Sequence, residues 1–194
     1  MGIIASSCCG SVVQTSMRYR GSLSNDGHLA MKTEVYWVPG PWRGRLGIVP
    51  RPRGGDWLQD EVRSWRDAGL DVVASLLTSE EAAELGLEQE KALAQKEGVE
   101  LRTFPVPDYG VPSSRADFAR FLEELHRALE SGKNVGVHCR QGIGRSSLVV
   151  AALLVSTGED PDSAFGRIAK ARGREVPDTD EQRRWVARMA ASAA

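Results

Sequence analysis

The sequence predicts an α/β fold in which a central, mostly parallel sheet is flanked by helices on both faces. Two observations predict it. From residue 35 onward, short apolar runs alternate with longer segments that carry apolar residues at helical spacing. The run DVVASLL is apolar almost throughout, which is typical of a strand covered on both faces. The chain of 194 residues is long enough for one domain with a real core.

Five segments are expected to form the strands of this sheet. The first two, VYWV and LGIV, are separated by a turn rich in proline and glycine, which indicates two short neighbouring strands. The last, NVGVHC, leads directly into a glycine-rich turn. The strands are expected at 35–38, 46–49, 71–77, 100–104 and 134–139.

The helices are predicted from apolar spacing and from residues that favour helix starts. Asp56 is expected to cap the first helix, and Ser114 with Asp117 forms a capping box for the helix over 115–130. Pro161 stands at the first position of another helix, where proline is favoured. The helices are expected at 56–69, about 79–85, about 88–97, 115–130, 146–157, 161–171 and from about 179.

One domain, residues 31–194, is expected to follow a disordered tail. The tail, residues 1–30, is rich in serine and glycine. Its opening MGIIAS fits a myristoylation pattern, with Cys8 and Cys9 available for palmitoylation, so membrane association is expected only if this end is lipidated. No apolar run approaches the ~20 residues needed to span a bilayer.

The composition narrows the partners and the location. A formal net charge of −1 argues against general nucleic-acid binding, so no nucleic-acid partner is expected. Only three cysteines are present, two of them adjacent near the start, which excludes a disulfide framework. A reducing, cytoplasmic location is therefore expected. The protein is also expected to be a monomer.

One glycine-broken segment carries the candidate chemistry. VHCRQGIGRSS, residues 137–147, follows a predicted strand, and ligands of parallel sheets bind beyond such strand ends. Gly142 and Gly144 allow the backbone N–H groups to curl inward as an anion nest beside a helix N-terminus. Arg145 offers a fork of donors for two phosphate oxygens. The same positive field is expected to lower the pKa of Cys139, which would lie as a nucleophile at the floor of a phosphate cradle.

Other interpretations of this segment fit less well. The segment does not match the dinucleotide-binding motif Gly-x-Gly-x-x-Gly, because position 147 is serine. It does not match the Walker A motif either, because it lacks Gly-Lys-Ser/Thr. A zinc site would need more ligands than the adjacent His138 and Cys139. A buried structural cysteine stays an alternative, although it explains neither the glycines nor the arginine.

The stretch HCRQGIGRS resembles the signature of the cysteine-dependent protein-tyrosine phosphatase superfamily, and the chain resembles its small dual-specificity phosphatases. In this stretch Cys139 and Arg145 enclose five residues, and Ser146 follows. Two further motifs support the resemblance: the proline-rich PVPDYGVPS, with Asp108, is similar to a general-acid loop, and VPDTDEQ is similar to a glutamine-bearing loop. The resemblance covers roughly residues 35–186 and implies the fold of that superfamily.

The resemblance implies a metal-independent phosphomonoesterase that needs no cofactor and works through a phosphocysteine intermediate. Cys139 would attack phosphorus and Asp108 would protonate the leaving oxygen. Ser146 would hydrogen-bond the departing thiolate, and Gln182 would orient the attacking water. The phosphate would be held by Arg140, Gln141, Gly142, Ile143, Gly144 and Arg145, with His138 supporting the loop from behind.

The expected substrate is a phosphorylated protein, with phosphotyrosine and, through a shallow cleft, phosphoserine or phosphothreonine. An alternative function is that of a phosphoinositide or RNA 5′-phosphatase of the same superfamily, which would use the same catalytic mechanism on a different substrate. A pseudophosphatase that binds phosphate without turnover usually lacks the cysteine, the arginine or the acid, and all three are present here. A rhodanese-like sulfurtransferase resembles the segment too, but its loop is one residue shorter and has no use for Asp108.

Overall fold

The fold is built on a five-stranded sheet with the order β3-β4-β7-β5-β6. The computed structural model describes residues 22–23, 29–30 and 33–193. All neighbouring strands run parallel except β3, which pairs antiparallel with β4 at one edge. The strands are β3 (Tyr36–Val38), β4 (Leu46–Ile48), β5 (Val72–Ser75), β6 (Glu100–Thr103) and β7 (Val135–His138). The predicted mostly parallel sheet is confirmed, and each strand lies within its expected segment.

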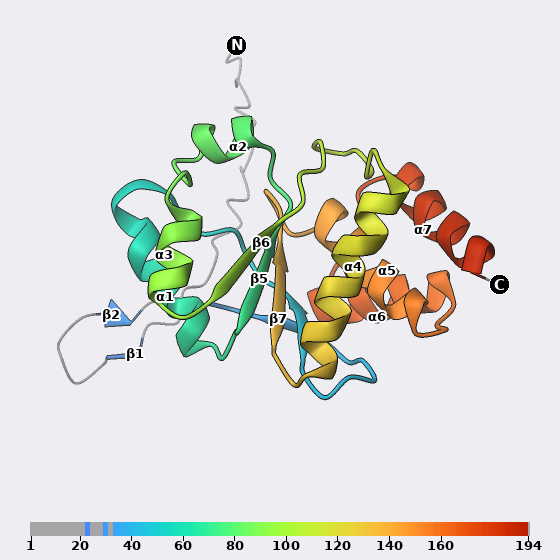
Figure 1. The fold of residues 1–194 in the computed structure, drawn as a ribbon, viewed down its shortest axis with the longest axis horizontal. Helices are drawn as coiled ribbons and strands as arrows, with labels where there is room; N and C mark the ends of the chain where they lie inside the picture. Colours follow the sequence, from blue (N-terminus) through green and yellow to red (C-terminus); the bar gives the residue numbers. More distant parts are fainter. Residues whose placement is uncertain (1–21, 24–28, 31–32, 194) are drawn as a thin grey trace, which may run out of the picture.

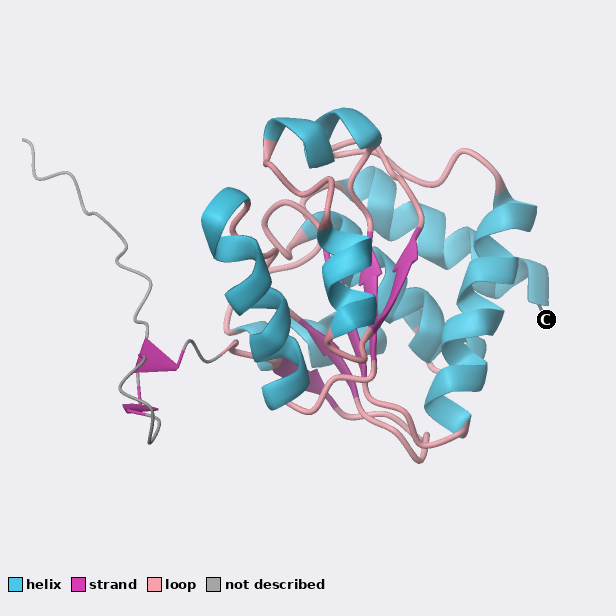
Figure 2. Ribbon diagram, turned by 60° about the vertical axis from the view of Figure 1, so that its left-hand side comes forward, coloured by secondary structure: helices cyan, strands magenta, loops and turns pink. Residues whose placement is uncertain are grey.

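Helices cover both faces of the sheet, as Figures 1 and 2 show. One face carries α1 (Leu58–Asp67) and α3 (Glu90–Lys96), whose apolar residues form one core cluster with the sheet. The other face carries a larger cluster and four helices. These are α4 (Arg115–Glu130), α5 (Gly144–Ser156), α6 (Pro161–Arg172) and α7 (Asp180–Ala193).

The central helix of the larger layer, α5, is apolar on nearly every side. Every residue from Gly144 to Leu154 is buried, as expected for a helix enclosed by other elements. It packs against β4 and β7 of the sheet and against α4, α6 and α7. The start of this helix is thereby fixed at the carboxyl end of β7.

Three helix starts differ in detail from the sequence prediction. Asp56 does not cap α1, because a short 3-10 helix, η1 (Gly55–Trp57), precedes it and its N-cap makes no side-chain hydrogen bond. Ser114 caps α4 by accepting the N–H of Asp117, but the Asp117 carboxylate pairs with Arg120 instead of closing the capping box. Helix α5 begins two residues earlier than expected, at Gly144.

The predicted N-terminal tail lies mostly outside the described residues. Its two described pieces, β1 (Ser22–Leu23) and β2 (Leu29–Ala30), pair antiparallel with each other. Cys8 and Cys9, with the lipidation pattern before them, are outside the described residues. Within the described part of the chain, no helix combines the length and apolarity needed to cross a membrane.

Candidate active site

The candidate site lies at the carboxyl end of β7, the middle strand of the sheet. The segment between this strand and α5, residues 139–143, is called the cysteine loop below. Backbone hydrogen bonds from the residues that follow the two neighbouring strands hold the end of β7. The Val49 N–H donates to the Val137 carbonyl, and the Leu76 N–H donates to the His138 carbonyl. Helix α2 (Ser79–Glu84) and the loop that leads into α4 lie at the same end of the sheet (Figure 1). The topology therefore gathers three segments that are distant in the sequence.

Cys139 lies at the floor of the cysteine loop and is 3% exposed. The Gly142 N–H donates to its Sγ over 3.2 Å. Gly142 has a φ of +66°, and a Cβ added there would lie 3.2 Å from Ile48 Cγ2. Both features favour glycine, so the loop can turn back over the sulfur.

Arg145 is a buried cation that joins three segments around the cysteine. It is 2% exposed. Its Nη1 and Nη2 donate to the Glu81 carboxylate over 2.6 and 2.9 Å, and Nη1 also donates to the Val106 carbonyl over 2.8 Å. Its Nη2 lies 2.9 Å from Asp108 Oδ1. Burial alone would lower the pKa of Arg145, but Glu81, Cys139 and Asp108 together hold it above its usual value.

One donor of Arg145 has no protein partner. Among the described residues, Nε is buried and makes no hydrogen bond. Within the same part of the chain, the backbone N–H groups of Arg140, Gln141 and Ile143 in the cysteine loop also lack an acceptor. A buried donor such as the Arg145 Nε is rarely left unpaired, and together with the inward turn of the loop N–H groups it is suited to an anion.

Glu81, on α2, was missed by the sequence analysis. It accepts from Thr78, the N-cap of its own helix, in a complete capping box, and from Arg145. Burial alone would raise the pKa of Glu81, but these hydrogen bonds hold it below its usual value. The Thr-x-x-Glu spacing in the sequence signals the capping box, whereas nothing in it signals the partner across the site.

Asp108 reaches the site from an irregular loop, residues 105–113, called the aspartate loop below. Its side chain is 44% exposed while its Oδ1 faces the Arg145 guanidinium. The next residue, Tyr109, has a φ of +55° and is 60% exposed. The Gly110 N–H donates to the Pro107 carbonyl, which closes a tight turn at Asp108. The structure thus brings the expected acid, cysteine and arginine together.

Gln182, at the start of α7, links the aspartate loop to the first residue of α5. Its side chain is fully buried, and its Nε2 donates to the Gly110 carbonyl over 3.0 Å. Its Oε1 lies 2.8 Å from the position that a Cβ at Gly144 would occupy. The expected role in orienting water stays a prediction, and the observed contact is a tether of the aspartate loop.

Asp178 is a second acidic residue at the site that the sequence analysis did not single out. Its carboxylate lies against Gly144 and accepts the Gly144 N–H. Partial burial raises the pKa of Asp178, and the negative charge of Asp108 raises it further against that hydrogen bond. The only signal in the sequence is its place in VPDTDEQ beside Gln182.

Two expected residues lie differently from the prediction. Ser146 makes no hydrogen bond to the sulfur, because its Oγ is buried and has no partner among the described residues. Arg140 points away from the loop interior and pairs with Glu84 over 2.8 and 3.0 Å.

His138 lies behind the cysteine loop, in the place expected of a supporting residue. The side chain is fully buried, and its ring centroid lies 5.8 Å from that of Trp65. Its Nε2 lies 3.1 Å from Glu90 Oε1, without the geometry of a hydrogen bond.

The family model described as "Polymorphic toxin system, DSP-PTPase phosphatase" matches residues 48–159. This segment is more than half of the chain and includes Glu81, Asp108, Cys139 and Arg145. The chain belongs to the DSP-PTPase family. The resemblance read from the sequence is confirmed, while Gln182 lies beyond the matched segment.

Individual relatives agree with this membership. Cyclin-dependent kinase inhibitor 3 of Rattus norvegicus is 27% identical over 131 residues, which are 66% of this chain and 61% of the rat protein. This chain therefore spans less than two thirds of that relative's length.

Solved structures of phosphatases share the fold. Kinase associated phosphatase, with its catalytic-site cysteine replaced by serine, has a TM-score of 0.74 at 20% identity and covers 84% of this chain and 96% of its own. Tk-PTP in its active form has a TM-score of 0.64 at 26% identity and covers 78% of this chain and 94% of its own. The predicted protein-tyrosine-phosphatase fold is confirmed.

A Gly144→Ala substitution tests the close packing at the start of α5. The added Cβ would meet Asp178 and Gln182, so the cysteine loop or α7 must shift. We expect kcat/KM for p-nitrophenyl phosphate to fall about tenfold or more, because small displacements of catalytic groups are costly. Gly166→Ala in α6 is the matched control: nothing lies within 4 Å of its Cβ, and it should leave kcat/KM unchanged. Equal activity of the two variants would contradict the packing argument.

Glu81→Gln tests the carboxylate that holds Arg145. The pKa of Glu81 is lower in the folded protein than in the unfolded chain, where it is about 4.3. The ion pair with Arg145 therefore stabilises the folded protein fully at pH values above about 4.3. This stabilisation disappears as the pH falls through the pKa of Glu81 in the folded protein. Urea unfolding should therefore show wild type more stable than Glu81→Gln at pH 7, with a gap that shrinks below about pH 4. Glu84→Gln removes an exposed pair and should change stability little. A gap independent of pH would contradict this account.

Proposed function

We propose that this protein hydrolyses phosphate monoesters through a phosphocysteine intermediate, with phosphorylated proteins as its substrates. The observation that carries the proposal is the buried Arg145, whose unpartnered Nε accompanies the free N–H groups of the cysteine loop. A phosphate bound by these donors lies next to the Cys139 sulfur and within reach of Asp108. Family membership supports the same chemistry.

In the first step the Cys139 thiolate attacks phosphorus. The S–P bond forms as the bond from phosphorus to the leaving oxygen breaks, and Asp108 gives its proton to that oxygen. Arg145 and the loop N–H groups hold the equatorial oxygens while charge redistributes. The Glu81 carboxylate fixes the guanidinium plane, so the donors are in place before the substrate arrives.

In the second step water attacks the phosphocysteine. Asp108, now a carboxylate, accepts a proton from the water as the S–P bond breaks, and the products are inorganic phosphate and the Cys139 thiolate. The side chain of Gln182 is close to the aspartate loop and to the start of α5, which supports a role in positioning this water. In place of Ser146, the Gly142 N–H is the group that stabilises the departing thiolate.

A protein substrate is supported by the relatives. The solved neighbour with a TM-score of 0.74 is a kinase associated phosphatase, and the matching rat protein is named cyclin-dependent kinase inhibitor 3. The half-exposed Asp108 and exposed Tyr109 lie at the rim, where they can reach a phosphorylated side chain on a protein surface. The cytoplasmic location and the monomeric state stay predictions.

Turnover of p-nitrophenyl phosphate by the full chain, with a metal chelator present, tests this function. We expect metal-independent hydrolysis that is lost in Cys139→Ser, because serine cannot replace the thiolate under these conditions. Cys139→Ser should retain phosphate binding, measured by calorimetry, since the other donors remain. Equal turnover by wild type and Cys139→Ser would overturn the assignment of the nucleophile.

The role of Asp108 is tested by comparing two leaving groups. Asp108→Asn should lower kcat by roughly 10²–10⁴-fold for an alkyl phosphate, whose leaving oxygen needs a proton. The loss should be smaller for p-nitrophenyl phosphate, because its leaving oxygen is stable without protonation. Asp117→Asn, an exposed aspartate on α4, is the control. A loss of the same size for both substrates would contradict the acid role.

A further inference from the structure

A cavity adjoins the proposed phosphate site. Its volume is about 600 Å³, and its walls come from α2, the connection from α2 to α3, β6 and the aspartate loop. Pro105 and Pro107 line it and flank Val106, whose carbonyl accepts Arg145. Glu80 lines it and precedes Glu81, the partner of Arg145. A group bound in this cavity would therefore lie next to the bound phosphate.

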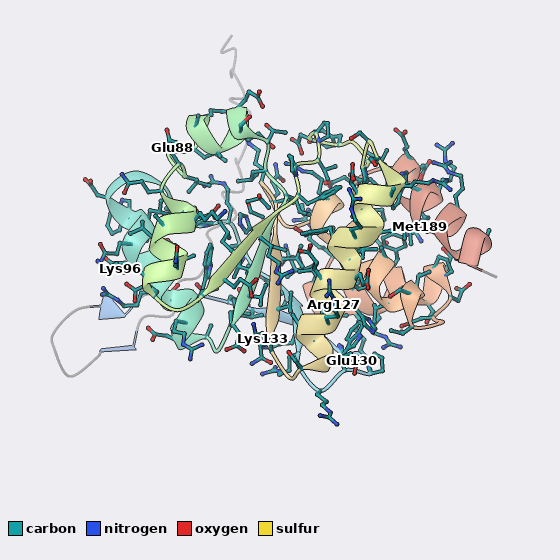
Figure 3. All side chains as sticks on the ribbon, in the orientation of Figure 1. Glu88, Lys96, Arg127, Glu130, Lys133 and Met189 are labelled. Atoms are coloured by element: carbon teal, nitrogen blue, oxygen red, sulfur yellow. The ribbon has the colours of Figure 1, made fainter. Side chains whose placement is uncertain are left out.

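The lining of this cavity combines negative charge with apolar surface. Its carboxylates belong to Glu80, Glu88 and Glu90, against a single cation, Lys91. Figure 3 shows Glu88 on the connection between α2 and α3. Within the described part of the chain, none of the three carboxylates forms an ion pair with lysine or arginine. The apolar lining comes from Leu77, Leu87 and Leu101, with the two prolines of the aspartate loop.

Glu90 is the member of this lining that points most clearly to a ligand. It is 4% exposed, and its Oε1 is buried without a hydrogen bond, 3.1 Å from Nε2 of the His138 ring. A carboxylate taken out of water is costly unless a charge or donor compensates it. A cation in the cavity that Glu90 lines would add electrostatic compensation for this carboxylate.

We infer that this cavity binds an arginine or lysine side chain of the substrate, at a position close in sequence to the phosphorylated residue. The inference rests on the proposed phosphatase function and adds a substrate preference to it. A basic side chain matches both parts of the lining, because its aliphatic stem packs on leucine and proline while its charged end meets the carboxylates. An acidic side chain would be repelled, and a small apolar one would leave the carboxylates unpaired.

The test uses phosphopeptides that share one phosphorylated residue and differ at one flanking position, occupied in turn by arginine, alanine and glutamate. At low salt we expect kcat/KM to be about tenfold higher with arginine than with alanine at one or more flanking positions, and lowest with glutamate. The preference should weaken as salt increases, since partly exposed charges are screened.

The double variant Glu80→Gln/Glu88→Gln leaves Glu90 as the one lining carboxylate and should weaken this preference severalfold, whereas Glu123→Gln on the exposed face of α4 should keep it. Turnover of p-nitrophenyl phosphate, which has no flanking residue, reports separately on the phosphate site. Affinity of the Cys139→Ser protein for the same peptides measures the preference even if no turnover occurs, so failure of the phosphatase function can be told apart from failure of the cavity proposal. Equal affinity for arginine and alanine peptides, or a preference that the double variant leaves undiminished, would overturn the inference.

Discussion

The site depends on one buried cation, the guanidinium of Arg145. A charge at 2% exposure is stable only with several compensating partners, and here they come from α2 and the aspartate loop. The requirement works in both directions. Glu81 compensates the buried charge of Arg145, and Arg145 in turn holds the aspartate loop in place through Val106 and Asp108. The same contacts leave Nε free for an anion.

The position of this cation follows from the architecture of the sheet and α5. Parallel strands end at the same edge, so β5, β6 and β7 deliver α2, the aspartate loop and the cysteine loop to one place. Helix α5 is apolar almost all round and packs between the sheet and α7, which fixes its N-terminus under the cysteine loop. Gln182 then joins α7 to the aspartate loop. The arrangement explains why a helix at the end of the chain contributes to a site centred on residue 139.

Local patterns in the sequence predict much of this molecule. Apolar runs and helical spacing identify the strands and helices, and the Cys-x5-Arg spacing identifies the cysteine loop, because both are properties of neighbouring residues. Contacts between distant segments are not predictable in this way, so Glu81 and Asp178 were missed. The thiolate contact expected of Ser146 is absent, since its buried Oγ has no partner among the described residues, and side-chain contacts of this kind are not set by residue order alone. Asp56 does not cap α1, because a 3-10 turn takes the place of the first helical turn.

The most direct test of the central claim is to trap the intermediate. The full chain is mixed with a phosphate monoester, turnover is quenched rapidly, and the phosphorylated residue is located by mass spectrometry of its peptides. The account predicts a phosphoryl group on Cys139, with no such adduct in Cys139→Ser. Turnover without any adduct on Cys139, or with the phosphoryl group on another residue, would contradict it.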